Sequence, residues 1–358
     1  MNQLLRIVLL PASWLYGIGV FLRNKQFDLG IRKSVSFEIP VMVIGNLSAG
    51  GTGKTPLAEY LVKLLKEGHK TGVLSRGYRR RTKGYVEVNA DRKTAETGDE
   101  PMQLKRKFPD VTVSVCESRV IGITTMIHEY PDLEVLILDD AFQHRYVKPG
   151  LSLLITDYNH PFTRDSLLPA GRLREPVNGA KRADAIIVSK CPVALNKELR
   201  ENFKSELAVS PSQLVFFSFQ KYGLAYEIFN PDKTLSFEKS DGFLLFCGIA
   251  NPDSLVNYLR QQSGEVKLLS YHDHHPYSIK DLKEIHLEYS MLTSSRKILI
   301  TTEKDAVRLI ELQDYITSQQ LEIYCMAVKT VFFEEDKAPF DEFITSFVHS
   351  FTPEINEE

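Results

Sequence analysis

The 358-residue sequence predicts an α/β protein with a mostly parallel sheet and a second, smaller α/β domain joined to it by a β-strand linker. Three observations predict this class. Short apolar runs rich in β-branched residues recur between positions 39 and 189, as buried parallel strands require. Amphipathic stretches of helical period separate several of these runs, which is the rhythm of a doubly wound sheet. After about residue 240 the alternation starts again.

The amino-acid composition excludes several classes of protein. Hydrophobic residues make up 43% and charged residues 25% of the chain, enough for a buried core in roughly two domains, which excludes disordered and disulfide-scaffold proteins. The 44 basic and 46 acidic residues nearly cancel, so we expect no nucleic-acid partner. The cysteines are far apart in the chain and predict buried thiols in a reducing compartment: Cys116, Cys191, Cys247 and Cys325.

The first domain is expected over residues 31–205. Its opening strand covers residues 39–45, and a Gly-rich turn and a helix over about 54–67 follow. The leucines of that helix recur at i, i+4, i+7 and i+8, which places them on one buried face. Another helix is expected at 119–130, and further strands at 72–75, 111–115, 134–138, 151–156 and 185–189.

The rhythm changes after about residue 205. Residues 206–240 are predicted as a β linker and hinge, with two or three strands joined by turns between 214 and 238, as fits an antiparallel linker. The smaller α/β domain is expected over 241–335, with strands at 243–247 and near 266–269, 297–301 and 322–328. Residues 336–358 contain a predicted helix over 339–351 with phenylalanines along one face, and its docking side is left open.

Residues 1–30 are predicted as a helix that lies in a membrane interface. The chain carries no charge from Ile7 to Leu22, but this uncharged stretch is shorter than the roughly 20 residues that cross a bilayer. Trp14 and Tyr16 suit the headgroup level, and the flanking basic side chains can reach lipid phosphates. The alternatives are a helix packed on the domain behind it and a secretory signal, although no small-x-small cleavage site follows.

A phosphate-binding loop follows the first strand. Residues 45–56 read G-N-L-S-A-G-G-T-G-K-T-P and end in the G-K-T of a Walker A pattern, whose first glycine is replaced by Ser48. Such glycines let backbone N–H groups surround phosphates at the start of a helix. The sequence therefore predicts a P-loop NTPase-type fold with a nucleotide site formed by Ser48, Ala49, Gly50, Gly51, Thr52, Gly53, Lys54 and Thr55.

Two carboxylates are predicted at the same sheet edge. In V-L-I-L-D-D, four apolar strand residues precede Asp139 and Asp140, so both side chains lie at the carboxyl end of a strand. One of them can bind Mg²⁺ together with the Thr55 hydroxyl, and the alternative is a capping aspartate. Gln143 and His144 follow near the same edge.

Two loops suit an anionic substrate. S-R-G-Y-R-R-R-T-K-G-Y follows the second strand and begins with Arg76 and Tyr78. A solvated surface or an RNA patch can have this composition, but the position at the carboxyl edge favours phosphate binding. In R-L-R-E-P, Arg174 precedes Glu175 and can neutralise charge on a transferred phosphoryl group, unless the two form only a surface ion pair.

Two further segments are candidates for acid–base chemistry. T-G-D-E-P presents Asp99 and Glu100 ahead of a helix, where a carboxylate can accept a hydroxyl proton, although a plain turn explains the loop equally well. Y-H-D-H-H-P-Y suggests a metal site, but adjacent residues of an extended segment point opposite ways and no zinc-type spacing supports one. We favour a polar loop in which Asp273 and His274 tune an active-site carboxylate.

Several motifs occur in this order: G-N-L-S-A-G-G-T-G-K-T-P, S-R-G-Y, G-D-E-P, L-D-D-A-F-Q-H-R, L-R-E-P, G-I-A-N-P, H-D-H-H and T-E-K-D-A. Together they make the chain resemble the tetraacyldisaccharide 4′-kinases of lipid A biosynthesis. The resemblance implies transfer of the γ-phosphate of ATP, with Mg²⁺, to the 4′-hydroxyl of a tetraacyldisaccharide 1-phosphate, giving lipid IV-A. It also implies a membrane-associated enzyme on the cytoplasmic face of the bacterial inner membrane, with no obligatory protein partner.

The resemblance assigns roles by motif. Asp99 would be the base, assisted by His274, while Lys54, Asp139 and Asp140 would organise the phosphates and the metal. The metal ligands would be Thr55, Asp139 and Glu175. The disaccharide or its phosphate would be held by Arg76, Tyr78, Arg119, Gln143, His144 and Arg174.

A rival interpretation is a membrane-associated P-loop ATPase switch of the MinD/ArsA type. Those proteins carry a lysine just before the two glycines of the loop, and this sequence has Ala49 there. A soluble small-molecule kinase is the nearer alternative, but it leaves the apolar N-terminus unexplained. The lipid-kinase interpretation is therefore preferred.

Overall fold

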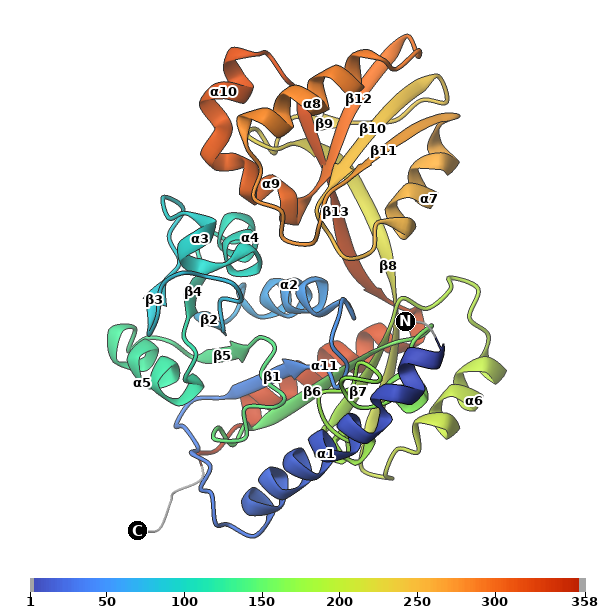
Figure 1. The fold of residues 1–358 in the computed structure, drawn as a ribbon. Helices are drawn as coiled ribbons and strands as arrows, with labels where there is room; N and C mark the ends of the chain where they lie inside the picture. Colours follow the sequence, from blue (N-terminus) through green and yellow to red (C-terminus); the bar gives the residue numbers. More distant parts are fainter. Residues whose placement is uncertain (1–2, 354–358) are drawn as a thin grey trace.

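The computed structural model describes residues 3–353 and has two lobes that β8 (Leu214–Glu227) and β13 (Ile323–Phe332) connect (Figure 1). Strands of both lobes form one hydrogen-bonded path in the order β11-β10-β12-β13-β8-β7-β6-β1-β5-β2-β4-β3, with β9 (Thr234–Leu235) paired to β8. Most neighbouring strands are parallel, so the predicted α/β class is confirmed.

The first lobe is built on a parallel sheet. Val41 and Val43 of β1 face one hydrophobic core while Met42 and Ile44 face the other, because helices cover both sides of the sheet. The parallel strands are β1 (Val41–Gly45), β2 (Thr71–Ser75), β4 (Thr112–Val115), β5 (Val135–Leu138), β6 (Leu151–Asp157) and β7 (Ala185–Ser189). The short β3 (Val86–Glu87) closes the edge antiparallel to β4.

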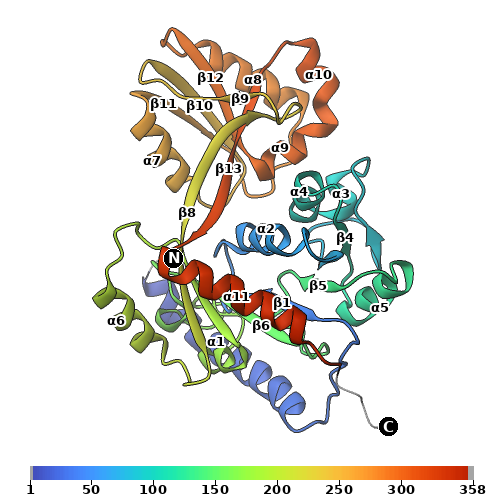
Figure 2. The same cartoon turned by 180° about the vertical axis from the view of Figure 1, so that it is seen from behind.

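The C-terminal helix docks on the first lobe. Phe340 and Ile344 of α11 (Glu334–Ser350) are fully buried in the same core as Leu57 and Leu61 of α2 (Lys54–Leu65). Figure 2 shows α11 in front of this sheet and α1 behind it. The remaining helices and 3₁₀ turns of this lobe are α3 (Thr94–Thr97), α4 (Asp99–Lys107), α5 (Arg119–Glu129), η1 (Phe162–Arg164), η2 (Val177–Arg182) and α6 (Lys197–Leu207).

The connection between the lobes contains two antiparallel strands between 214 and 238, β8 and β9, as predicted, but the two differ greatly in length. Most of that segment is one strand of 14 residues, β8. Its start pairs parallel with β7 in the first lobe, and from Ser218 onward it pairs antiparallel with β13. The length of β8 was not expected, because the strand crosses from a buried environment to a half-exposed one and its apolar alternation fades near Gly223 without a turn.

The second lobe repeats the α/β pattern on a smaller scale. Its strands β10 (Asp241–Cys247), β11 (Glu265–Ser270) and β12 (Arg296–Thr302) are parallel to one another, and β12 is parallel to β13. Each strand expected here lies within or overlaps one of these elements. The helices are α7 (Asp253–Gln262), α8 (Ile279–Ser290), α9 (Glu303–Leu309) and α10 (Gln313–Ser318), with the turn η3 (Ile310–Leu312) between the last two.

The N-terminal helix α1 (Gln3–Asp28) lies on the outside of the first lobe (Figure 1). One face contacts the lobe: the Ser13 hydroxyl donates to the carbonyl of Leu167, and the Tyr16 hydroxyl to that of Arg174. The other face is apolar and exposed. By length and composition alone, residues 5–28 could cross a membrane.

Candidate active site

The predicted nucleotide loop lies between β1 and α2 at the carboxyl edge of the sheet. Gly50 and Gly53 have φ values of 116° and 92°, a conformation that favours glycine, and Gly53 is the residue before α2 begins. The Asn46 amide donates to the Thr52 hydroxyl at 2.8 Å, and Ser189 of β7 donates to the Thr52 carbonyl at 2.6 Å. Side chains on both sides therefore hold the loop in shape before any ligand binds.

Lys54 opens α2 and faces Asp140. Its Nζ lies 3.6 Å from Asp140 Oδ1 and donates to Asn46 Oδ1 at 3.2 Å. Arg174 donates to both Asp140 oxygens, at 3.1 and 2.8 Å, so the predicted R-L-R-E-P arginine does reach the nucleotide loop. Although burial opposes ionisation, the Lys54 and Arg174 charges lower the pKa of Asp140 well below its usual range.

Asp139 has a different environment from its neighbour. Its side chain is 1% exposed, and Oδ1 has no hydrogen-bond donor in the described part of the chain. Burial, followed by the charges of Glu100 and Asp140, raises the pKa of Asp139 to about 7. A buried carboxylate oxygen without a donor, next to the ionised Asp140 and close to the start of α2, fits a hard cation such as Mg²⁺.

The predicted base and its helper meet across the two lobes. Asp99 is the first residue of α4 in the first lobe, and its Oδ2 lies 2.7 Å from Nδ1 of His274, which belongs to the loop after β11 in the second lobe. Burial raises the pKa of Asp99, but hydrogen bonds from His274 and Arg308 outweigh it, and the net shift is downward. The carboxylate is thus ionised at neutral pH.

Two cations of α9 at this position were missed in the sequence. Arg308 donates to Asp99 Oδ2 through Nε at 2.9 Å and Nη2 at 2.6 Å. Lys304 lies 3.1 Å from a carboxylate oxygen of Glu100 and 3.4 Å from Nε2 of His274. Lys304 stands in the T-E-K-D-A motif, so its position after a strand of the second sheet was a signal that could have been used.

The basic loop after β2 also reaches the second lobe. The rings of Tyr78 and His274 are 5.8 Å apart, and the Arg79 guanidinium donates to the carbonyl of Asp273 at 3.0 Å. Arg76 is exposed at the same edge. The loop therefore lines the space between the lobes with cationic and aromatic side chains, as expected for contact with a phosphorylated sugar.

Two predicted roles do not fit the observed contacts. Arg119 was expected to hold the substrate, but it is 2% exposed and donates to the carbonyls of Cys116 and Asp139. Glu175 was expected to bind the metal, but both of its oxygens accept from Arg182, at 2.9 and 2.8 Å. In each case other protein groups use the side chain, so Arg119 supports the Asp139 backbone and Glu175 is a buried ion-pair partner.

Gln143 and His144 lie behind the nucleotide loop. The Gln143 amide donates to the Asn46 carbonyl at 2.9 Å and to Glu175 at 2.8 Å, which ties the L-R-E-P segment to the loop. Burial, followed by the charges of Arg119 and Arg76, lowers the pKa of His144 to about 4. His144 is therefore neutral at neutral pH, when it can accept a hydrogen bond from a substrate hydroxyl.

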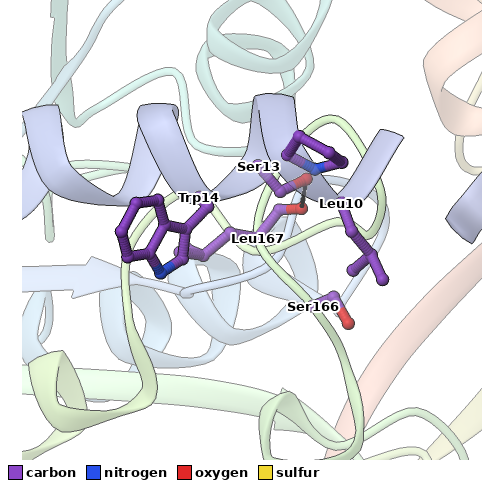
Figure 3. A pocket seen from close by; sticks show the side chains of 6 residues that line it. Leu10, Ser13, Trp14, Ser166 and Leu167 are labelled. Atoms are coloured by element: carbon purple, nitrogen blue, oxygen red, sulfur yellow. Dashed lines mark hydrogen bonds between the residues drawn. The ribbon is translucent and has the colours of Figure 1, made fainter. Parts of the chain in front are cut away.

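An apolar pocket of about 440 Å³ opens beside α1 (Figure 3). Its walls are formed by Leu10, Pro11, Ser13, Trp14, Ser166 and Leu167. Figure 3 shows the Leu10 and Trp14 side chains leaving the helix on either side of Leu167, with the Ser13–Leu167 hydrogen bond between them. The pocket thus joins the exposed apolar face of α1 to the segment that precedes Arg174.

Comparisons of the sequence and of the fold with known proteins point to one family. The model of the tetraacyldisaccharide-1-P 4′-kinase family matches residues 5–349. Proteins named tetraacyldisaccharide 4′-kinase from Phocaeicola vulgatus and Bacteroides fragilis are 41% and 42% identical, over 95% and 96% of this chain and 94% and 93% of their own lengths. The LpxK protein of Aquifex aeolicus, whose crystal structure was solved in complex with ATP, superposes with a TM-score of 0.75 at 29% identity, covering 96% of this chain and 99% of that one. The chain belongs to the tetraacyldisaccharide-1-P 4′-kinase family.

Proposed function

We propose that this chain transfers the γ-phosphate of ATP to the 4′-hydroxyl of a tetraacyldisaccharide 1-phosphate, with Asp99 as the base and His274 as its helper. The observation that carries the proposal is the 2.7 Å contact between Asp99 and His274, made across the lobes at the carboxyl edge that also holds the nucleotide loop. A switch ATPase has no need of a base for an alcohol, so this pair favours the kinase over the MinD/ArsA-type alternative.

The nucleotide is held by the loop from Ser48 to Thr55. Backbone N–H groups at the start of α2 point at the β- and γ-phosphates, and Lys54 exchanges Asp140 and Asn46 for phosphate oxygens. Thr55, Asp139 and Asp140 would hold Mg²⁺, and the bound ion would supply positive charge to offset the negative charge that develops on transfer. Arg174 is paired with Asp140 in the structure. From this position its guanidinium can stabilise the charge on the transferred phosphoryl group.

The acceptor sugar lies between the lobes. Arg76 and Tyr78 from the basic loop and His144 from the first lobe contact the disaccharide or its phosphate, and Asp99 accepts the hydroxyl proton. An ionised carboxylate of low pKa is an adequate base here, because the proton leaves late in a loose transition state. We propose that the β linker acts as a hinge, so that closure of the lobes completes the site and excludes water.

We also propose that α1 seats the enzyme on the cytoplasmic face of the inner membrane. A lipid with four acyl chains does not leave the bilayer easily, since each buried CH₂ contributes about 0.8 kcal/mol to its retention. The exposed apolar face of α1 enters the interface, and the pocket beside Trp14 takes part of an acyl chain as the headgroup reaches the site.

A phosphate-transfer assay tests this function. It uses γ-labelled ATP, Mg²⁺ and detergent-dispersed tetraacyldisaccharide 1-phosphate. Lys54→Ala serves as the inactive variant, and Lys63→Ala, an exposed lysine on the same helix, as the matched control. We expect label in a lipid product with wild type and Lys63→Ala, and none with Lys54→Ala. Label released only as free phosphate would remove the lipid acceptor and favour the ATPase switch.

A further inference from the structure

We propose that Arg308 is a positioning residue that holds Asp99 with one oxygen saturated and the other free for the acceptor hydroxyl. The inference rests on the proposed function and adds a residue to its machinery. Arg308 belongs to α9 of the second lobe and Asp99 to α4 of the first, and the two helices face each other between the lobes (Figure 1).

The hydrogen bonds of Asp99 are distributed unevenly between its two oxygens. Nε and Nη2 of Arg308 and Nδ1 of His274 all lie within 2.9 Å of Oδ2. No donor among residues 3–353 is within hydrogen-bonding distance of Oδ1. The carboxylate side chain is 12% exposed, and Oδ1 is not one of the fully buried unpartnered oxygens, so a substrate hydroxyl can reach it. The geometry therefore leaves Oδ1 as the acceptor for a substrate proton.

Arg308 is itself held rigidly. Its side chain is 4% exposed, and Nη1 donates to Asp305 Oδ1 at 2.6 Å and to the Gly248 carbonyl at 3.0 Å. Asp305 is fully buried and in turn accepts hydrogen bonds from the Tyr277 hydroxyl, at 3.2 Å, and the Gly248 amide, at 3.0 Å. The guanidinium is thus fixed by one carboxylate and orients the other through two N–H groups on one oxygen, a contact that the single nitrogen of a lysine cannot reproduce.

The charged groups around Asp99 predict the direction of a pH effect. Arg308 and His274 contact it directly, Glu100 follows it on α4, Lys304 lies beside Glu100 and His274, and Asp273 is 3.6 Å from Nε2 of His274. Removing the arginine takes away a positive charge and two hydrogen bonds that favour the ionised carboxylate. The pKa of Asp99 then rises, and the base becomes protonated at a higher pH than in the wild type.

The test compares the pH–rate profiles of Arg308→Met, Arg308→Lys and the wild type in the lipid-phosphorylation assay. For Arg308→Met we expect kcat to fall roughly 10- to 100-fold, the acid limb to move up by about one pH unit or more, and the KM for ATP to stay within about twofold. Arg308→Lys keeps the positive charge but cannot place two N–H donors on Asp99 Oδ2. We expect an intermediate kcat with a smaller shift of the acid limb.

Arg296→Met is the matched control. Arg296 pairs with the buried Asp241 at 2.6 Å in the same lobe, at the opposite end of the strands β10 and β12, so its loss affects stability without touching Asp99. We expect its profile to match the wild type. Since Arg308→Met leaves Asp305 unpaired, the double variant Arg308→Met/Asp305→Asn removes both charges and keeps the test valid if the single variant does not fold.

The outcomes are distinguishable. A wild type that transfers no phosphate to lipid would refute the proposed function itself. An active wild type with Arg308 variants that keep the wild-type acid limb and kcat would overturn the positioning role, and so would a loss of activity that merely follows the fraction of folded protein. If Arg308→Lys is the only variant that folds, a wild-type kcat and acid limb in that variant would also overturn the positioning role.

Discussion

At the scale of single residues, neighbouring carboxylates of the site have opposite properties. Asp140 faces Lys54 and Arg174 and has a lowered pKa, whereas Asp139, one position earlier, is buried and has a raised one. Asp99 and Glu100 form a second pair, in which Asp99 meets His274 and Arg308 while Glu100 meets Lys304. Adjacent positions point in different directions, so each carboxylate of a pair can have a separate role.

The Asp99 and Glu100 pair gives the first prediction. We expect Asp99→Ala to lower turnover by roughly 10²- to 10⁴-fold, the usual contribution of a positioned base, and Glu100→Ala to lower it by less than about tenfold. Nucleotide binding should survive both changes, because neither side chain contacts the loop from Ser48 to Thr55. The measurement is kcat for lipid phosphorylation together with ATP affinity by calorimetry. Equal losses of kcat in the two variants would contradict the assignment of Asp99.

Asp139 gives the second prediction, which concerns metal removal. A ligand that binds only the folded state raises the unfolding temperature, so Mg²⁺ with ATP should stabilise the wild type and EDTA should abolish the effect. In Asp139→Asn the oxygen that lacks a protein donor loses its charge, and we expect the Mg²⁺-dependent part of the shift to disappear. Thermal unfolding with ATP, with and without Mg²⁺, measures it. An undiminished Mg²⁺ effect in this variant would exclude Asp139 as a ligand.

At the scale of elements, the sequence correctly predicted those helices, strands and turns that a local sequence pattern determines. The unit of β1, the glycine loop and α2 was found because strand, turn and helix each have their own local sequence pattern. The length of β8 was not found, because its two halves pair with different neighbours and its middle is half exposed. Contacts between distant segments were equally hidden: no spacing reveals that Arg308 reaches Asp99, 209 positions earlier.

The helix α1 shows how one element can serve two environments. Its inner face is fixed by polar contacts, including the Ser13 hydroxyl, which donates to Leu167 and accepts from the Ala170 amide at 2.8 Å. Its outer face leaves Ile7 and Leu15 more than half exposed. A water-soluble protein rarely leaves such a patch uncovered, so the outer face is the part that we propose meets lipid.

The third prediction separates these two faces. We expect Ile7→Ser/Leu15→Ser to weaken binding to anionic vesicles by at least roughly tenfold, because each aliphatic side chain contributes about 1.5 kcal/mol or more on burial. The unfolding temperature should barely change, since both side chains are exposed at 63% and 68%. Vesicle sedimentation measures binding, and Leu224→Ser, an exposed leucine of β8, is the control. Unchanged sedimentation of the double variant would place the membrane contact elsewhere.

At the scale of the whole molecule, a buried charge cluster connects the lobes away from the phosphate loop. Lys107 of α4 donates to Glu59 of α2 at 2.6 Å and to Glu303 of α9 at 3.0 Å, and Tyr226 of β8 donates to Glu303 at 2.8 Å. A cavity of about 520 Å³ lies beside it. Two carboxylates share one ammonium here. Burial and the Glu303 charge raise the pKa of Glu59 to about 7, because Lys107 only partly offsets them.

This cluster makes the stability of the two-lobed state depend on pH. In the unfolded chain Glu59 ionises near its ordinary pKa of 4.5, whereas in the folded protein it keeps its proton up to about pH 7. Between these values the folded state binds more protons than the unfolded state, so the contribution of Glu59 to the free energy of unfolding falls as the pH rises through that window. Above it the folded protein carries an ionised, poorly compensated carboxylate at the lobe contact.

The fourth prediction follows from this decrease in the free energy of unfolding with rising pH. Glu59→Gln cannot ionise and keeps an acceptor for the Gln103 amide, so its free energy of unfolding relative to the wild type should increase by about 1–3 kcal/mol between pH 5 and pH 8. Urea unfolding at both pH values measures the difference, with Glu67→Gln, an exposed glutamate just after α2, as the control. A difference that stays constant with pH, or falls, would show that Glu59 is already ionised at pH 5 and that Lys107 compensates both carboxylates. The lobes would then be joined by a cluster that stays ionised over this range, and their closure would not respond to pH through this contact.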